Sequence, residues 1–274
     1  MDNAFLVEHE MACRLTALAV VLGAMATWEA LAPRRTLSVP RLRRWRSNFG
    51  VALFNTLVLR VALPTTAIGM AELASTRGWG LFNHIGTGGW LAVVLSVVVL
   101  DLVLYLQHVA LHNVPLLARL HAVHHADPDF DITTGIRFHP LEILLSMLVK
   151  YAAIVALGAP ALAVLLFELL LSLGSLFSHG NVRLPEPADR LLRRGLVTPD
   201  MHRIHHSVIE AERNSNYGFC LSAWDRLFQT YTSAPQGGQR AMRIGLDAYP
   251  DTQVSTTLSG ILTIPFRSTQ RSNP

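Results

Sequence analysis

Histidines at helical spacing dominate the middle of this chain. Ten of the 12 histidines lie between residues 108 and 206, and eight of them fall into the three boxes QHVALH, HAVHH and HRIHH. The boxes contain His108 and His112; His121, His124 and His125; and His202, His205 and His206. Residues three or four apart share one face of an α-helix, so each box presents its imidazoles in one direction. Helices build metal sites in this way.

The number of imidazoles indicates more than one metal ion. Eight or more imidazoles exceed the ligand set of one tetrahedral zinc ion, which is complete at four. His139 and His179 lie between the boxes and are further candidates. The sequence therefore predicts two metal ions in one histidine cage, because coincidental clustering would have to recur at three similarly spaced boxes. Neutral imidazole suits iron, zinc and copper, so the donor set alone leaves the metal open.

Membrane helices are predicted to position these boxes. The composition is 51% apolar and only 15% charged, which is unusual for a soluble protein. Apolar runs long enough to cross a bilayer fall at residues 15–32, 49–71 and 90–106. Two shorter runs, at 141–157 and 161–177, predict a helical hairpin or a shallow re-entrant pair. The predicted fold class is all-α integral membrane, with four to five membrane helices or hairpin segments and a cytoplasmic helical cap that carries the dimetal site.

The distribution of charge predicts the orientation. Six arginines and no acid lie between residues 34 and 46, whereas the N-terminal segment carries Asp2, Glu8 and Glu10. By the positive-inside rule the arginine loop is cytoplasmic and the N-terminus is outside, so the third span delivers its histidines to the cytoplasmic face. Lys150 is the only lysine among 23 basic residues, which is typical of a GC-rich bacterial genome and predicts a bacterial inner membrane.

The polar C-terminal third is predicted to fold back onto the membrane helices. Residues 183–274 contain no spanning run, so this cap must bring the third histidine box to the other two. The segment after about Ser255 is rich in serine and threonine and is expected to be loosely ordered. Three regions result: membrane helices with the basic loop at 1–94, a catalytic domain at 95–232 and a cytoplasmic tail at 233–274.

The second and third predicted spans each carry a charged residue that could serve the site, Arg60 and Asp101. Asp101 precedes His108 by seven residues and lies on nearly the same helical face, where a carboxylate would orient a metal-bound imidazole. An ion pair between Asp101 and Arg60 of the second span is an equally weighted alternative.

The position of the cage favours oxidation of a lipid over hydrolysis. A site where membrane helices meet a cytoplasmic cap gives a lipid chain access from the bilayer, while electrons arrive from the water side. A zinc-dependent lipid hydrolase is the alternative, because zinc polarises ester carbonyls and activates water. Against hydrolysis, the boxes contain no general-base carboxylate and the chain has no GxSxG motif. A metal transporter or a haem protein fits less well, because the boxes lie at helix ends and haem needs only one or two histidines.

The text around the histidines carries a family resemblance. The segments are DLVLYLQHVALH, HHADPDFDITTGIRFHPLE, FSHGNVRLP, TPDMHRIHHS, NSNYG and WDRLFQTY. Together with HxxxH, HxxHH and HxxHH in this order, they resemble bacterial members of the fatty acid hydroxylase and sterol desaturase superfamily of membrane di-iron oxygenases. The resemblance covers about residues 95–232.

The resemblance implies a non-haem di-iron centre, with O2 as co-substrate, that hydroxylates or desaturates a fatty acyl, sterol or related lipid. It implies nine ligands, which are His108, His112, His121, His124, His125, His179, His202, His205 and His206. His139 falls in the FHPLE segment and is expected to be a ligand or to lie beside one. No cytochrome b5-like segment or GxGxxG motif is present, so a separate ferredoxin or cytochrome with its reductase is the expected electron donor. The charge of +4 is dispersed between apolar blocks, which argues against a nucleic-acid partner.

Overall fold

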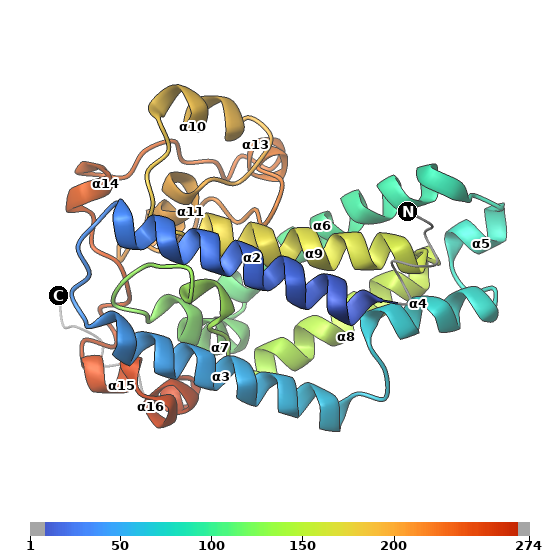
Figure 1. Cartoon of the computed structure of the whole chain (residues 1–274), viewed down its shortest axis with the longest axis horizontal. Helices are drawn as coiled ribbons and strands as arrows, with labels where there is room; N and C mark the ends of the chain where they lie inside the picture. Colours follow the sequence, from blue (N-terminus) through green and yellow to red (C-terminus); the bar gives the residue numbers. More distant parts are fainter. Residues whose placement is uncertain (1–8, 268–274) are drawn as a thin grey trace.

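A bundle of long helices carries a compact cap at one end (Figure 1). The computed structural model describes residues 9–267, and its regular structure there is helical apart from two isolated β-bridges. The long helices are α2 (Glu10–Leu31), α3 (Arg41–Ala62), α6 (Gly89–Asn113), α8 (Pro140–Leu157) and α9 (Ala161–Ser178). The shorter helices of the cap are α7 (Pro115–His125), η1 (Thr134–Ile136), α10 (Glu186–Leu192), α11 (Pro199–His205), α12 (Glu210–Arg213), α13 (Ala223–Leu227) and α14 (Gly238–Ala241).

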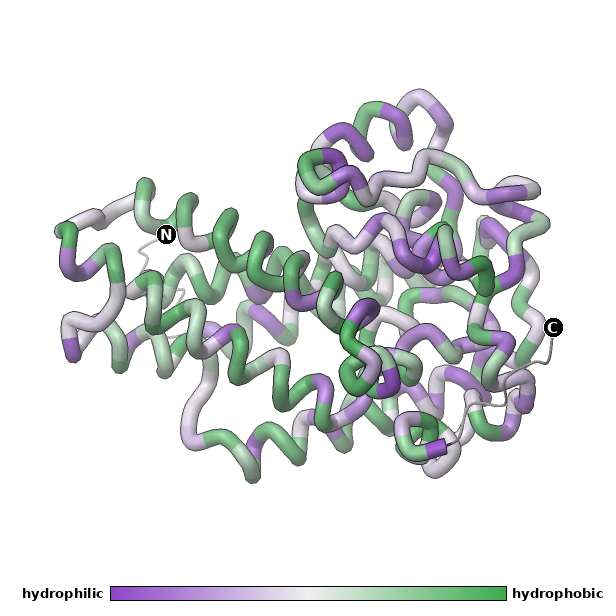
Figure 2. The backbone as a smooth tube through the Cα atoms, turned by 180° about the vertical axis from the view of Figure 1, so that it is seen from behind, coloured by the Kyte–Doolittle hydropathy of each residue, from purple (hydrophilic) through white to green (hydrophobic). Residues whose placement is uncertain are grey.

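Five helical segments are long and apolar enough to cross a membrane. Four are α2, α6, α8 and α9, and the fifth begins with α3. Hydrophobic residues follow the bundle, whereas polar residues gather in the cap (Figure 2). The chain is therefore an integral membrane protein, and the predicted all-α fold class is confirmed.

The second predicted span differs from the structure. We expected one helix over 49–71, but α3 ends at Ala62 and a separate helix, α4 (Ala67–Thr76), follows. Pro64 explains the break, because a proline disfavours helical geometry in the residue before it, and Leu63 is extended at φ −114° and ψ 136°. The chain then continues through α5 (Leu81–Ile85) at the end of the bundle remote from the cap (Figure 1).

Helices α8 and α9 form an antiparallel hairpin, and each is long and apolar enough to cross a membrane. The depth of this hairpin in the membrane stays a prediction. Gly158 ends α8 in the left-handed conformation, at φ 67°, and Pro160 directly precedes α9. A Cβ at Gly158 would lie 2.7 Å from the carbonyl oxygen of Trp79. Glycine is therefore required here both for the backbone conformation and for the close approach of the segment before α5.

A buried charge triad joins three of the membrane helices. Glu168 of α9 accepts hydrogen bonds from Lys150 of α8 at 2.8 Å and from Arg14 of α2 at 2.7 Å. The side chains of Glu168 and Lys150 are only 5% and 10% exposed. Charges inside a membrane bundle are costly unless paired, and these three satisfy one another.

The cap and the arginine loop lie at the same end of the bundle (Figure 1). Helix α2 starts away from the cap and runs toward it, so this loop, which joins α2 to α3, comes next to the histidine helices. This matches the relative placement that the charge pattern predicted. The side of the membrane stays a prediction, and residues 1–8, with Asp2 and Glu8, lie outside the described residues.

The prediction of a loosely ordered tail after Ser255 is wrong for most of that segment. Residues 252–266 form α15 (Thr252–Thr256), α16 (Leu258–Thr263) and η2 (Ile264–Phe266), which pack on α3 and α7. Ile261 and Ile264 are fully buried in one cluster with Val51 and Val123. Burial of these apolar residues outweighs the low helical propensity of the surrounding serines and threonines. Residues 268–274 lie outside the described part of the chain.

Candidate metal centre

The structure gathers all nine predicted ligands into two adjoining groups. Within each group, one ligand nitrogen of every residue lies within 4.8 Å of those of the others. The larger group, called group 1 below, contains His108, His112, His121, His125 and His205. Group 2 contains His124, His179, His202 and His206. The groups touch, since the rings of His125 and His206 stack at 4.5 Å between centroids. Both groups are able to bind metal, and the assignment of individual ligands stays a prediction.

Each helix contributes its histidines from the end that meets the cap. Helix α6 supplies His108 and His112 from its last turns, and α7 supplies one HxxHH box. His179 directly follows α9, and His206 directly follows α11, which carries the other two histidines of its box. Pro199 occupies the first turn of α11, where its missing N–H costs no hydrogen bond. Each group thus combines histidines from the ends of the membrane helices with histidines from the cap.

The nitrogen positions fit metal ions. In group 1, Nε2 of His108 lies 3.1 Å from Nε2 of His121 and 3.0 Å from Nε2 of His205. In group 2, Nε2 of His179 lies 3.2 Å from that of His124 and 3.1 Å from that of His202. Nitrogens bound at about 2.1 Å to one ion are separated by roughly 3.0–3.4 Å, which matches these distances.

Hydrogen bonds to the opposite ring nitrogen set the tautomer of five histidines. In each of them Nδ1 lies within 3.3 Å of an oxygen acceptor, so Nδ1 carries the proton and Nε2 keeps its lone pair toward the group. The pairs are His108 with the carbonyl of Tyr217, His121 with the carboxylate of Glu142, His124 with the carbonyl of Arg137, His179 with the carbonyl of Ser175, and His205 with the carbonyl of Ser215. By contrast, neither ring nitrogen of the buried His125 or His206 has a hydrogen-bond partner among the described residues. Buried polar atoms without partners are unfavourable, and a bound metal would satisfy one nitrogen of each ring.

Glu142 is the site residue that sequence reasoning missed. Its Oε1 lies 2.7 Å from Nδ1 of His121, and its side chain is 2% exposed. A buried carboxylate in this position fixes the ring and raises the basicity of the ligand nitrogen. The signal was present, since Glu142 lies in the first turn of α8 in the FHPLE segment.

His139 belongs to neither group, so its expected role as a ligand is not supported. It caps α8 instead: Nδ1 accepts a hydrogen bond from the N–H of Leu141 at 3.2 Å, and Nε2 lies 3.3 Å from the carbonyl of Leu262. A helix N-terminus has unpaired N–H groups, which explains why an acceptor is placed directly before Pro140.

Asp101 does not orient His108, because the Nδ1 of His108 is held by Tyr217. The Oδ2 of Asp101 instead accepts hydrogen bonds from Nε1 of Trp224 at 2.9 Å and from the N–H of Leu221 at 3.3 Å. The alternative pairing with Arg60 is also absent from the ion pairs of residues 9–267. Asp101 therefore attaches the segment around α13 to the side of α6.

Burial keeps the cap histidines neutral, as metal ligands must be. Desolvation lowers the pKa of His179 to about 4, with the carbonyl of Ser175 acting in the opposite direction. Burial, followed by neighbouring imidazoles, also lowers the pKa of His202 and His205 well below the usual value. Neutral imidazoles offer lone pairs near pH 7 without competition from protons.

A buried ion network supports the loop between the second box and α8. Arg44, at the start of α3, binds Asp127 through two parallel hydrogen bonds of 2.7 and 2.8 Å and reaches Asp131 as well. Burial alone would raise the pKa of Asp127, but Arg44 lowers it to about 2. The same loop contains Arg137, whose Nε donates to the carbonyl of Val123 and whose own carbonyl accepts a hydrogen bond from Nδ1 of His124. Residues outside the histidine boxes thus hold the boxes in place.

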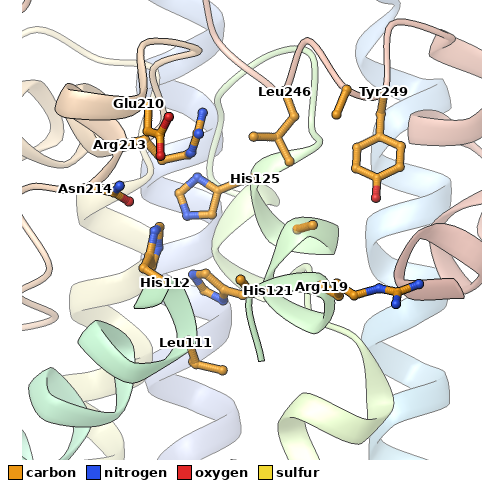
Figure 3. A pocket seen from close by; sticks show the side chains of 13 residues that line it. Leu111, His112, Arg119, His121, His125, Glu210, Arg213, Asn214, Leu246 and Tyr249 are labelled. Atoms are coloured by element: carbon orange, nitrogen blue, oxygen red, sulfur yellow. The ribbon is translucent and has the colours of Figure 1, made fainter. Parts of the chain in front are cut away.

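A cavity of about 250 Å³ reaches group 1 from outside. His112, His121 and His125 line it, with polar side chains of α12 and Asn214 at another side. Leu246 and Tyr249 of the C-terminal segment border the same space (Figure 3). Group 1 is therefore open to a substrate, and part of the cavity wall comes from the region that we had assigned to a tail.

The comparison with protein families agrees with this site. The model described as "Fatty acid hydroxylase" matches residues 93–230, about half of the chain and all nine histidines of the two groups. The chain belongs to the fatty acid hydroxylase family. The family resemblance predicted from the sequence is therefore confirmed.

Two characterised relatives narrow the comparison. The family member is 33% identical over 145 residues to the ornithine lipid hydroxylase OlsE of Rhizobium tropici, covering 53% of this chain and 43% of the relative. It is 27% identical over 133 residues to an alkylglycerol monooxygenase of Caenorhabditis elegans, covering 48% of this chain and 25% of the relative. The matched region thus spans less than half of either relative. No solved structure matches the chain.

Proposed function

We propose that this protein is an O2-dependent di-iron hydroxylase that inserts oxygen into a C–H bond of a membrane lipid. The observation that carries the proposal is the pair of adjoining all-nitrogen groups, one of which opens to a cavity at the end of a membrane bundle. Family membership supports a lipid substrate. The two relatives are named a hydroxylase and a monooxygenase, which favours hydroxylation over desaturation for this chain.

The nine histidines would hold two iron ions, one in each group. Bound iron supplies the activation of O2 and the electron transfer that breaking a C–H bond requires. The chain supplies the orientation: Glu142 and four backbone carbonyls hold Nδ1–H of five ligands, so that their Nε2 atoms converge. These hydrogen bonds would keep the ligand nitrogens in place, which avoids reorganisation during the reaction.

Aromatic side chains cover group 2, whose four histidines are all buried. Phe138 stacks on His124 at 4.5 Å between ring centroids, and Phe130 stacks on His179 at 5.4 Å. These rings exclude water from group 2, whereas group 1 faces the cavity. The lipid would therefore approach group 1, with its reacting carbon beside His112, His121 and His125.

The active site would lie on the cytoplasmic face of a bacterial inner membrane, and electrons would come from a separate donor. The arginine-rich loop next to the cap supports this orientation through the positive-inside rule. A ferredoxin, or a cytochrome with its reductase, would deliver electrons to the cap side.

Metal analysis and isotope labelling together test the proposal. Protein purified without oxygen should contain two iron ions per chain, and Mössbauer spectra should show high-spin iron with nitrogen ligands. With a reductase system and membrane lipids, 18O from 18O2 should enter the lipid product. A zinc-loaded protein that releases product without O2 would instead establish the hydrolase.

A further inference from the structure

A group of apolar side chains is exposed on the part of the cap that stands off from the bundle. This part comprises α10, α13 and the segment between residues 192 and 197, and we call it the overhang (Figure 1). The exposed apolar side chains are Leu191 (66%), Leu192 (36%), Leu196 (46%), Leu227 (65%) and Phe228 (46%). Exposed apolar side chains in a group mark an interaction surface more often than isolated ones do.

The overhang is one connected unit. The N–H of Ser222 donates to the carbonyl of Gly195 at 3.1 Å, and Leu196 forms an isolated β-bridge with Leu221. The side chain of Ser222 also donates to the carbonyl of Arg193 at 2.8 Å. The apolar side chains of the two helices are therefore held on a common frame.

Contacts with α6 fix the depth of the overhang along the bundle. Phe228 stacks on Tyr105 at 5.3 Å between ring centroids, and Trp224 donates to Asp101. Both partners precede the first histidine of α6, so the α13 part of the overhang reaches back along the membrane helix beyond the level of the metal centre. Figure 2 shows hydrophobic residues at the edge of the overhang that is directed toward the membrane helices and away from the rest of the cap.

The length of α6 gives the depth of Tyr105 and Asp101 in the membrane. Trp90, at the start of α6, is 64% exposed, as expected for an aromatic residue at one membrane surface. About 20 residues of helix, or about 30 Å, cross the hydrocarbon and end near residue 110. Tyr105 then lies roughly 7 Å inside the hydrocarbon boundary, and Asp101 about 13 Å inside, at 1.5 Å per residue.

We propose that the overhang is inserted in the membrane leaflet on the cap side and that lipid covers its apolar side chains. A water-soluble partner would not reach side chains at the level of Tyr105. Arg190, Arg194 and Arg226 are exposed on the same two helices and their linker, where they are placed to meet lipid phosphates. Exposed apolar residues accompanied by arginines are typical of interfacial helices, which insert by about 5–10 Å.

Spin labels at single cysteines test the insertion without requiring turnover. In a Cys13→Ala, Cys220→Ala background, labels are placed at Leu227→Cys and Phe228→Cys, with Leu191→Cys as a variant that leaves α13 intact. Val94→Cys on the exposed side of α6 is the control inside the membrane, and Arg240→Cys on α14 is the control in water. Collision rates with O2, which concentrates in lipid, and with a soluble nickel chelate are measured in proteoliposomes.

The overhang labels should resemble the Val94 label, with O2 collisions exceeding nickel collisions, and the Arg240 label should show the reverse order. Nickel collisions at 191, 227 and 228 that match those at Arg240 would overturn the proposal, because the surface would then face water. Exclusion of both reagents together with spin–spin broadening at 227 would also overturn it and would identify a second copy of the chain as the occupant.

Discussion

At the scale of single residues, substitution of Glu142 should lower activity while most of the metal stays bound. Glu142→Gln keeps an oxygen near Nδ1 of His121 but removes its charge, so the ring stays in place while the ligand becomes less basic. We expect activity to fall by about 10–100-fold, with most of the metal retained. Iron content and turnover of the same preparations measure this.

Asp101→Asn is the matched control for the loss of a buried carboxylate. The amide oxygen still accepts from Trp224, and no histidine depends on it. We expect near-normal iron content and activity. A large loss in Asp101→Asn with a normal Glu142→Gln would reverse our assignment of the two acids.

The histidines also predict how the metal-free protein responds to acid. Burial lowers the pKa of His179 to about 4, whereas an exposed histidine titrates near 6.5. Between these pH values His179 is protonated in the unfolded chain but not in the folded chain. The free energy of unfolding therefore falls as the pH drops from about 6.5 to about 4. The unfolding midpoint of metal-free protein in detergent should decrease over this range. A midpoint independent of pH there would contradict the neutral, buried state of the ring.

At the scale of helices, the charge triad should be a main support of the bundle. Lys150→Met leaves Glu168 with only the half-exposed Arg14 as a partner, and breaking a buried ion pair costs about 3–5 kcal/mol. We expect a clear drop in the thermal unfolding midpoint. Arg190→Gln is the control, because its pair with Glu186 is about 70% exposed and contributes little. Equal midpoints for the two variants would show that the triad does not stabilise the bundle.

The segment between α14 and α15 brings a part of the chain outside the family match to the cavity at group 1. If the proposed function holds, Ala248→Phe should narrow the cavity at group 1 and reduce turnover of bulky lipids more than that of small ones, with the iron content unchanged. Ala241→Phe adds the same ring on the exposed α14, away from the cavity, and should have no effect. Activity assays across lipids of different headgroup size measure the difference.

At the scale of the whole molecule, the crossings of the bundle place the arginine loop and the cap on one side. Reporter fusions after Arg46 and after Thr232 should therefore both report cytoplasm, since an even number of crossings separates them. Disagreement between the two reporters would mean that one of α3, α6, α8 or α9 does not cross.

The sequence predicted most of the architecture because its strongest signals are local. The spacing of the boxes and the apolar runs depend only on helix geometry, and all nine histidines meet as predicted. Long-range contacts could not be predicted from local patterns. No residue near Asp101 in the sequence indicates its contact with Trp224, and none near Ile264 indicates the apolar cluster with α3 and α7. The capping contact of His139 could not be predicted for the same reason, because it depends on where α8 begins.

The two histidine groups draw their members from residue 108 to residue 206, and each combines membrane helices with the folded-back cap. During synthesis, neither group is complete until α11 has left the ribosome and returned to helices made long before. Closing such long loops is slow and follows insertion of the bundle. An ion that needs the full set of ligands is therefore captured last, and the metal-bound protein is one whose membrane helices have already been assembled correctly.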